Sequence, residues 1–400
     1  MPVSPLTIKF PDIIVATLLR RHGDTGVQAH FNDLGAFVEE KGGKYQVVTP
    51  FSYYKLLVYP VFAVRKIIQI FRGQINVWWY RTFHYIFLKL SLSSKLKTED
   101  CPIIYACCPL SAKAAILSRR NTNQKVVLTV QFNKSQAYEW ALSGQIKPGD
   151  WVYRGIEKLE EEVLPSVDAL VFLTDFMQKH LEERIPAIKN VKSIIIPLFA
   201  STSENLGFPG VTGDIISIGT LEPRKNQAYL LKVLSQAKKM GFRYSLTLVG
   251  DGPDRSRLLD LTNELNLQDQ VHFLGFRPKA ARYISGHRAY AHSSVMESFG
   301  LVLIEAMAHG IPVLAAPVGG VPKVFSNGVE GIYWPLDDPE DGARKLIDLL
   351  EDAETYQRAA RAAKQRFEQQ FAANVVADRL VRFLSDVCAS GSPSQPVERL

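Results

Sequence analysis

Short apolar runs alternate with longer amphipathic runs along this chain of 400 residues. The first run, DIIVATL at 12–18, precedes a turn-rich loop at 20–26 and a helical pattern at 27–41. A short run that is apolar at every position is typical of a strand covered on both faces of a parallel sheet. The alternation therefore predicts a doubly wound α/β sheet. Further strands are expected at 46–49, 103–106, 126–130, 169–173 and 193–196, and a helix at 150–164.

A second series of the same kind follows residues 198–212, whose Ser, Gly and Pro content is typical of a linker. Its strands are expected at 215–218, 245–249, 271–274, 289–292 and 312–315, and its helices at 226–240, 255–265 and 301–309. The helix at 301–309 should end at Gly310, which favours a left-handed C-cap.

The two series predict two Rossmann-like domains, residues 1–198 and 199–372, that face each other across a cleft. Ligands of such sheets bind beyond the carboxyl ends of the strands, so we expect the site in that cleft. A last helical pattern over 353–387 is long enough to run back, and 373–400 is expected to form a crossover helix and tail.

Composition narrows the class of protein. The chain is 46% hydrophobic and 22% charged, which fits globular domains and excludes a disordered chain or a disulfide scaffold. Its four cysteines lack CxxC spacing and a nearby His cluster, so we expect free thiols rather than a metal site. No secretory signal and no run of about 20 apolar residues is found, which predicts a cytoplasmic protein.

The net charge of +7 is unevenly distributed. Residues 41–98 contain no Asp or Glu, but ten Lys or Arg and many aromatic residues. Basic residues bind anionic head groups, and Trp and Tyr favour the lipid–water boundary. The segment predicts a contact with a membrane surface or with an anionic, lipid-linked acceptor; the alternative is a pair of ordinary packed helices. No nucleic-acid module is recognised. The proposed contact residues are Arg65, Lys66, Arg72, Trp78 and Trp79.

Two carboxylates in the second half carry the strongest chemical signal. Glu297 is expected in a loop and Glu305, eight positions later, one turn into a helix. Phe299, Gly300 and Leu301 open that helix, and their backbone N–H groups are free to bind an anion. Glu305 is suited to accept hydrogen bonds from a ribose diol, and Glu297 from a sugar hydroxyl.

Adjacent cations give a second signal. Arg224 and Lys225 follow the strand at 215–218, where they are placed to clamp a diphosphate. Two weaker signals are the tight turn VGDGP at 249–253 and the strand end VHFLGF at 271–276, whose backbone suits a base edge. Another is the glycine-rich loop GDTGV at 23–27.

Together these motifs resemble the retaining family 4 glycosyltransferases of the GT-B fold, in the group 1 glycosyl transferases. The likeness is specific over about 213–345 and looser over 10–200. It is carried by GDTGVQAHF (23–31), IISIGTLEPRKN (215–226), LTLVGDGP (246–253), VHFLGF (271–276) and ESFGLVLIEAMAHGIPVLAAPVGGVPKV (297–324).

The resemblance implies a nucleotide-sugar donor held mainly by the second domain and an acceptor held mainly by the first. It assigns the diphosphate to Arg224 and Lys225, the ribose to Glu305 and the base region to Phe276. Glu297, Phe299, Gly300 and Leu301 would hold the transferred sugar and phosphate, with Gly26 opposite the phosphate. The sequence departs from the family at Thr220, where Arg is frequent, and at Gln131, where His is usual. A Gln amide can bind a sugar hydroxyl but does not titrate near neutral pH.

The expected reaction is retaining transfer of a sugar from a nucleotide-diphosphate sugar to an acceptor, without a metal or another cofactor. The chain has no Asp-x-Asp pair to hold a cation on the diphosphate. The acceptor is expected to be a lipid or lipid-linked glycan at the cytoplasmic face of a membrane, with a soluble acceptor as the alternative. A donor-binding scaffold, a phosphorylase, an epimerase and a membrane adaptor are the remaining alternatives.

Overall fold

The computed structural model describes residues 11–21, 23, 26–68, 73–100, 102–201 and 210–389, except the side chains at 55 and 65–68. The chain divides into two compact units. The first comprises the residues up to Ile196, apart from 24–26, together with the chain from Ala377 onward; the second runs from Pro197 to Val376 and takes in 24–26.

The first unit contains a six-stranded parallel sheet in the order β2-β1-β3-β4-β5-β6. Its central strands β3 and β4 are buried along their whole length, as their mostly apolar sequences favour. The strands are β1 (Ile13–Ala16), β2 (Tyr45–Val48), β3 (Ile103–Ala106), β4 (Lys125–Val130), β5 (Ala169–Phe172) and β6 (Lys192–Ile195).

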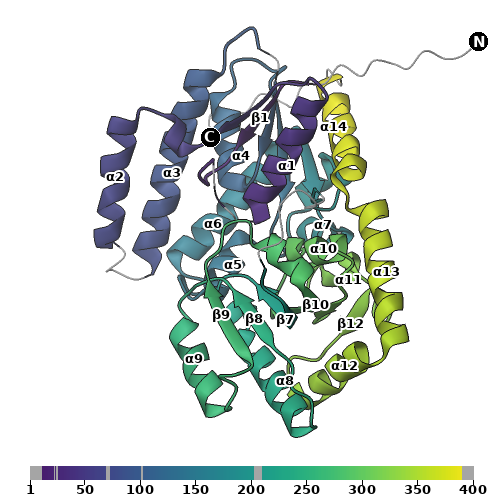
Figure 1. Cartoon of the computed structure of the whole chain (residues 1–400). Coiled ribbons are helices and arrows are strands. Elements are labelled where there is room, and N and C mark those ends of the chain that lie inside the picture. Colours follow the sequence, from purple (N-terminus) through teal and green to yellow (C-terminus); the bar gives the residue numbers. More distant parts are fainter. Residues whose placement is uncertain are drawn as a thin grey trace, which may run out of the picture. The chain divides into compact units, whose positions relative to one another are not determined.

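Helices surround this sheet, and α2 and α3 lie side by side as a hairpin at its edge (Figure 1). They are α1 (Gly26–Glu40), α2 (Lys55–Ile68), α3 (Gln74–Lys95), α4 (Pro109–Ser118), α5 (Gln136–Leu142), α6 (Trp151–Val163), α7 (Asp175–Arg184) and most of α14 (Ala373–Ala389). Short side chains begin several of them: Asp150 accepts from the Tyr153 N–H at 2.7 Å and so caps α6.

The second unit contains another six-stranded parallel sheet, in the order β12-β11-β10-β7-β8-β9. The chain winds outward from β7 to β9 and then returns to place β10 on the other side of β7. The strand order therefore reverses between β7 and β10, which is the switch point where doubly wound sheets bind ligands. The strands are β7 (Gly213–Ile218), β8 (Leu246–Val249), β9 (Val271–Gly275), β10 (His287–His292), β11 (Val313–Ala315) and β12 (Gly331–Tyr333).

Helices α8 and α12 pack together on this second sheet. Buried side chains of both helices, such as Tyr229, Leu234 and Leu346, join Trp334 and the strand residues in one core. The helices are α8 (Gln227–Lys239), α9 (Arg255–Glu264), α10 (Leu301–Ala308), α11 (Val321–Val324), α12 (Pro339–Glu351) and α13 (Ala353–Gln370), with the short 3-10 turns η5 (Pro223–Lys225) and η6 (Ala280–Gly286).

The two wound sheets confirm the predicted α/β class with two Rossmann-like units. The helical pattern over 353–387 forms two helices, α13 and α14, and α14 begins at Ala373. The break occurs because the backbone at 371–373 pairs with Ala200. The Ala200 N–H donates to the Phe371 carbonyl and the Ala373 N–H to the Ala200 carbonyl, both at 3.1 Å. Part of the predicted linker, 202–209, lies outside the described residues.

None of the described helices combines the length and the apolar character that crossing a membrane requires.

Candidate functional site

Polar side chains gather at the carboxyl edge of the second sheet, at the switch between β7 and β10. Strand β7 ends at Ile218 and leads through Gly219 into the turn η5, which carries Arg224 and Lys225. Strand β10 ends at His292, and the loop after it carries Glu297 to the start of α10. The Ser293 hydroxyl donates to the Lys225 carbonyl at 2.8 Å, which fixes the two loops to each other.

Lys225, Glu297 and His292 form a compact cluster. The Lys225 ammonium lies 2.7 Å from Glu297 Oε2, and His292 Nε2 lies 3.1 Å from the same oxygen. The Lys225 and Glu297 side chains are only 16% and 13% exposed, so their attraction is weakly screened by water. An ammonium group has three donors, and the contact with Glu297 occupies one of them.

The charge state of this cluster follows from its surroundings. Burial opposes ionisation of Glu297, but the Lys225 charge and the His292 hydrogen bond outweigh it and hold the pKa of that carboxyl well below its usual value. Burial also lowers the pKa of His292, although Glu297 opposes the change. The cluster therefore holds an ionised Glu297, a charged Lys225 and a neutral His292 that donates through Nε2 at neutral pH.

Arg224 is held by a carboxylate of its own. Its Nε and Nη2 donate to Glu222 Oε1 at 3.0 and 2.8 Å, and its Nη1 lies 3.4 Å from the Met296 carbonyl oxygen. The Arg224 N–H groups thus connect η5 to the loop that holds Glu297. Each of the two predicted cations is therefore balanced by one carboxylate, Glu222 or Glu297.

Two glycines let the backbone close around this loop. Gly300 precedes α10 in the left-handed region, at φ 88°, which side chains rarely adopt. The Gly320 N–H donates to the Glu297 carbonyl at 3.0 Å. A Cβ atom on Gly320 would lie 2.0 Å from the Ser298 carbonyl oxygen. Only glycine at 320 allows this close approach.

Glu305 lies on α10, in the turn predicted for it. Its charge and that of Glu297 both act on Tyr290, whose pKa is raised first by burial and then by these two carboxylates. The Tyr290 hydroxyl donates to the Ile218 carbonyl at 3.2 Å, at the end of β7. Glu297 and Glu305 therefore belong to one electrostatic environment at the switch point.

The other residues predicted to bind the sugar donor lie on several different elements. The Phe299 side chain is buried against Phe371 and the Leu301 side chain is buried as well, so only their backbones are placed to meet a ligand. Phe276 follows β9 and is 61% exposed. Gln131 follows β4 in the first unit, and its Nε2 is buried without a hydrogen-bond partner in the described structure. Gly26 begins α1. Their roles in donor binding stay predictions.

The residues of 41–98 that are predicted to contact a membrane or an acceptor differ in their exposure to solvent. Trp78 is 45% exposed, whereas Trp79 is buried against Phe83. Trp79 is thus a core residue of the first unit, and naming it as a contact was wrong: neighbouring positions on a helix face different directions. Arg65 and Lys66 belong to α2, but their side chains, and Arg72 as a whole, lie outside the described residues.

Sequence reasoning missed His292 and Glu222. The sequence does place His292 at the end of a predicted strand, five residues before Glu297, and this spacing was a usable signal. Within the described ranges no group of three or more His, Cys, Asp or Glu side chains is placed to hold a metal ion.

Part of this chain is similar to a known protein family. Residues 200–366 match the family model of the glycosyl transferases group 1. N-acetyl-alpha-D-glucosaminyl L-malate synthase of Bacillus anthracis is 34% identical over 36% of this chain and 37% of its own length. Phosphatidyl-myo-inositol mannosyltransferase of Mycobacterium leprae is 30% identical over 52% of this chain and 56% of its own length. The matches thus span about a third to just over half of these relatives.

Solved structures extend the likeness of fold to nearly the whole chain. Sucrose-phosphate synthase of Thermosynechococcus elongatus superposes with a TM-score of 0.71 at 19% identity, over 95% of this chain and 100% of that one. HepE of Anabaena, solved with UDP and glucose, gives 0.62 at 17% identity, over 94% and 99%. At such identities the likeness establishes the fold alone. The sequence match shows that residues 200–366 are similar to the glycosyl transferases group 1.

Proposed function

We propose that this protein transfers a sugar from a nucleotide-diphosphate sugar to an acceptor, with retention of the anomeric configuration and without a metal ion. The observation that carries the proposal is the buried Lys225–Glu297–His292 cluster at the switch point, inside the segment that matches the family. HepE, which shares the fold, is named as a complex with UDP and glucose, and this supports a nucleotide-sugar donor.

In this proposal the cations act on the leaving group. Transfer leaves negative charge on the diphosphate, and groups that bind this charge most strongly in the transition state accelerate the reaction. Lys225 keeps two donors for it, the N-terminus of α10 adds backbone N–H groups, and Arg224 braces the loop while it contributes charge. Glu305 holds the ribose diol.

Glu297 orients the sugar rather than attacking it. Its carboxylate is already committed to Lys225 and His292, which makes it a weak nucleophile but a well-placed hydrogen-bond acceptor. The acceptor hydroxyl attacks the anomeric carbon on the face that the diphosphate leaves, and the leaving phosphate oxygen takes its proton. This route explains retention without a covalent sugar–enzyme intermediate.

Ligand-induced stabilisation tests the donor site. UDP, GDP and ADP and their sugar conjugates are added in turn, and a ligand at about 100 times its Kd should add about 2.7 kcal/mol of stability. We expect one nucleotide series to raise the Tm, with the increase lost in Glu305→Ala and Arg224→Ala. Exposed Arg154→Ala is the matched control. No increase with any nucleotide contradicts donor binding and favours a scaffold with a non-functional donor site.

Product analysis tests the reaction itself. With the donor identified, NMR of the product should show the donor's anomeric configuration, and turnover should persist in EDTA. An inverted product contradicts the proposed route. Turnover that stops in EDTA and recovers with Mg²⁺ contradicts metal independence.

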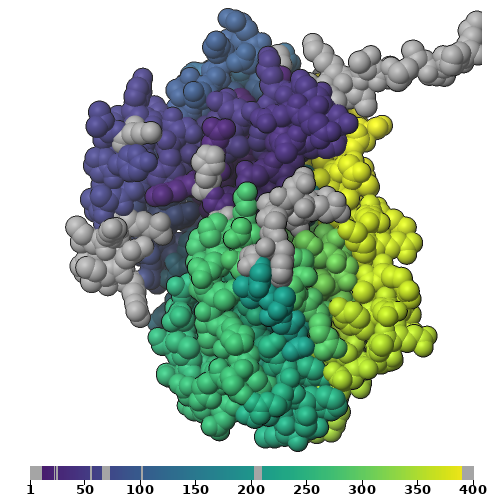
Figure 2. All heavy atoms as spheres, in the orientation of Figure 1, coloured from purple at the N-terminus to yellow at the C-terminus, as the bar shows by residue number. Residues whose placement is uncertain are grey.

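We further propose that the acceptor is a lipid or lipid-linked glycan, reached by peripheral contact of α2 with a membrane. Apolar side chains on and beside α2 are unusually exposed: Leu56 is 90%, Tyr54 72% and Leu57 57% accessible. Tyr59 and Val64 continue this face, and Figure 2 shows the helix at the surface of the first unit, in indigo. A contiguous apolar surface of this kind marks an interaction site.

The names of the relatives include both a lipid and a soluble acceptor. One is named for phosphatidyl-myo-inositol, a lipid, and another for malate, a small soluble acid. The exposed α2 face favours the lipid. Vesicles of anionic phospholipid should co-sediment the protein at low salt, and Leu56→Ser/Leu57→Ser should abolish this. The control changes two exposed residues of α3, Ile75→Ser and Ile86→Ser. Buried residues such as Leu88 and Leu92 are unsuitable, because changing them would damage the core. A protein that stays in the supernatant contradicts membrane contact.

A further inference from the structure

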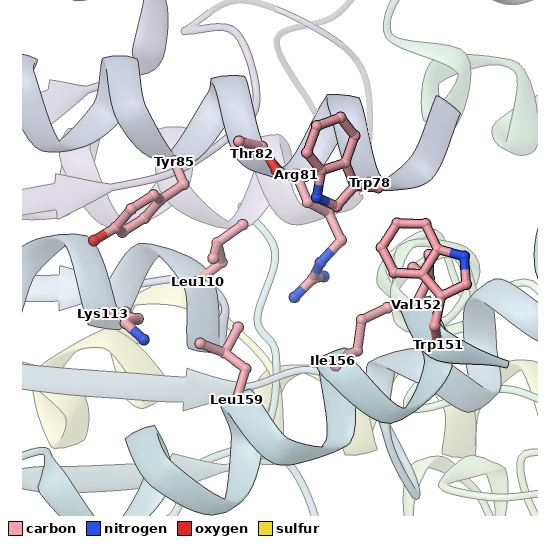
Figure 3. A pocket seen from close by; sticks show the side chains of 11 residues that line it. Trp78, Arg81, Thr82, Tyr85, Leu110, Lys113, Trp151, Val152, Ile156 and Leu159 are labelled. Carbon is pink, nitrogen blue, oxygen red and sulfur yellow. The ribbon is translucent and has the colours of Figure 1, made fainter. Parts of the chain in front are cut away.

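A separate cavity lies wholly within the first unit, between α3, α4 and α6. Its volume is about 290 Å³, near the lower end for small-molecule sites. Figure 3 shows Trp78 and Trp151 together at one end and Tyr85 with Lys113 at the other. The two indole rings are 6.4 Å apart, and both side chains are about half exposed. Leu110, Val152, Ile156 and Leu159 line the space between the ends.

Arg81 points from α3 into the middle of this apolar space (Figure 3). A guanidinium has five N–H donors, and Arg81 Nη1 donates to Gln136 Oε1 at 3.3 Å. No second hydrogen-bond acceptor for Arg81 is found in the described part of the chain. Burial lowers the pKa of the Arg81 guanidinium, although Cys108, Glu160 and Tyr80 oppose the change. The side chain is half-buried, and a cation among apolar side chains is stabilised by an anion that brings its own acceptors.

The neighbouring carboxylates are committed elsewhere. Glu160 lies within electrostatic reach of Arg81, but its Oε2 is 2.5 Å from Arg184 and its Oε1 accepts from the Gln136 N–H. Glu162 is 3.7 Å from Lys113. No Asp or Glu is among the residues that line the cavity. Among the lining residues only Arg81 and Lys113 are charged, and Lys113 is near Glu162, so Arg81 is the cation that a ligand in the cavity can meet.

Gly155 lines the same cavity from the middle of α6. Glycine inside a helix is less favourable than alanine by about 1 kcal/mol. A Cβ atom at this position would meet no other atom within 4 Å, so packing does not require glycine. Open space therefore lies over Gly155, and only a side chain larger than that of alanine is expected to fill it.

We propose that this cavity binds a single-chain amphiphile with one anionic head, such as a prenyl or alkyl phosphate. Its head would bind Arg81, and its chain would lie along the aliphatic side chains toward the two indole rings. The apolar lining, the Arg81 guanidinium in its middle and the open space over Gly155 together favour this class of ligand. The site belongs to the first unit and is distinct from the donor site, and the inference holds whether or not the ligand receives the sugar.

Titration of the full chain with three probes tests this site: geranyl phosphate, geraniol and inorganic phosphate. Trp78 and Trp151 provide a fluorescence signal, and calorimetry gives the affinity. Geranyl phosphate should bind about 10- to 100-fold more tightly than geraniol, the range expected for a hydrogen bond to a charged group. Inorganic phosphate should bind more weakly still, because it lacks the chain. Equal binding of geraniol and geranyl phosphate contradicts the role of Arg81, and no binding of either contradicts the site.

Two variants, each with a control, distinguish binding of the ligand's anionic head from binding of its hydrocarbon chain. Arg81→Met should remove the preference for phosphate over alcohol, whereas Arg154→Met, on the exposed side of α6, should keep it. Gly155→Leu should fill the cavity and weaken both prenyl probes by at least tenfold, whereas Gly155→Ala should bind them normally. If Arg81→Met does not fold, comparison of Gly155→Leu with Gly155→Ala still tests whether the ligand binds in this cavity. Unchanged binding in Gly155→Leu places the ligand elsewhere and overturns the proposal, and donor stabilisation should be unchanged in every Gly155 variant.

Discussion

Lys225 combines two roles at the residue scale. It carries the positive charge proposed to meet the diphosphate, and it also keeps Glu297 ionised in a site with little access to water. His292 fixes the same carboxylate from the other side while remaining neutral. The geometry therefore couples the charge of one residue to the protonation of the next.

The free-energy costs of removing the two partners of the buried pair should not add. We expect Lys225→Met and Glu297→Gln each to lower stability by about 3 kcal/mol, because each leaves a buried group without its partner. The double variant should lose clearly less than the sum of the two. Chemical denaturation of the four proteins measures this coupling. Simple additivity would mean that the 2.7 Å contact contributes nothing in solution.

Acid should weaken this cluster. Glu297 and His292 both have a pKa below the ordinary value, so the unfolded chain binds protons that the folded chain does not. Their stability contribution is therefore present at pH 7 and is lost as the pH falls, first below 6.5 for His292 and then below 4.5 for Glu297. His30 and His287 act in the same direction.

The variant His292→Asn isolates one part of this effect. Asn still donates to Glu297 but does not titrate, so its stability should fall less than that of the natural protein between pH 7 and pH 5. One proton contributes up to about 1.4 kcal/mol per pH unit. Thermal unfolding at the two pH values gives the comparison. Identical losses would show that His292 is exposed enough to take up a proton in the folded state.

At the scale of elements, the sequence anticipates strands better than loops. The strands β3 and β4 are recognisable because every position is buried and most positions are apolar. Strand β12 was missed because it has only three residues, one of them glycine. The break between α13 and α14 depends on pairing with Ala200, far away in the sequence, and no local pattern reports it.

The same limit applies to the site. The order of motifs along the chain placed Arg224, Lys225 and Glu297 at the correct edge of the second sheet. It could not indicate that Arg224 would contact Glu222 or that Lys225 would contact Glu297, because those contacts depend on side-chain directions in two loops. Likewise, composition marked the aromatic segment but could not distinguish the exposed Trp78 from the buried Trp79.

The approach of the 319–320 turn to the loop before α10 is testable. Gly320→Ala would bring a Cβ atom to the Ser298 carbonyl, so the loop must move and carry Glu297 with it. We expect a loss of about 1–3 kcal/mol in stability and weaker donor binding. Gly155→Ala, where the added atom meets nothing, should be neutral or slightly stabilising. Equal behaviour of the two variants would contradict the close packing.

At the scale of the whole molecule, the first unit is built from two separated parts of the chain. Helix α14 supplies Leu380, Val381 and Leu384, all buried, and the Arg379 guanidinium reaches the Ile195 carbonyl oxygen at 3.4 Å. Each buried apolar side chain contributes about 1.5–3 kcal/mol, and a domain has only about 5–15 kcal/mol of net stability.

A chain that ends after Val376 should therefore lose the folded first unit while the second unit persists. Calorimetry should show the loss of one transition, and limited proteolysis should leave a fragment that begins near Pro197. A chain that ends after Ala389 keeps all of α14 and is the control. Two intact transitions in the shorter chain would contradict the assignment of α14 to the first unit.

This discontinuity has a consequence for biosynthesis. The ribosome makes the residues up to Ile196 first, but the helix that completes their unit begins its contribution only at Ala377. At about 5–20 residues per second, the roughly 180 intervening residues take about 10–40 s to translate. During that time the second unit is still being made, while the first presents the apolar surface that α14 will cover. The first-made residues therefore cannot complete their unit until the whole of the second unit has been translated, and a chaperone that shields the exposed surface would act in this interval.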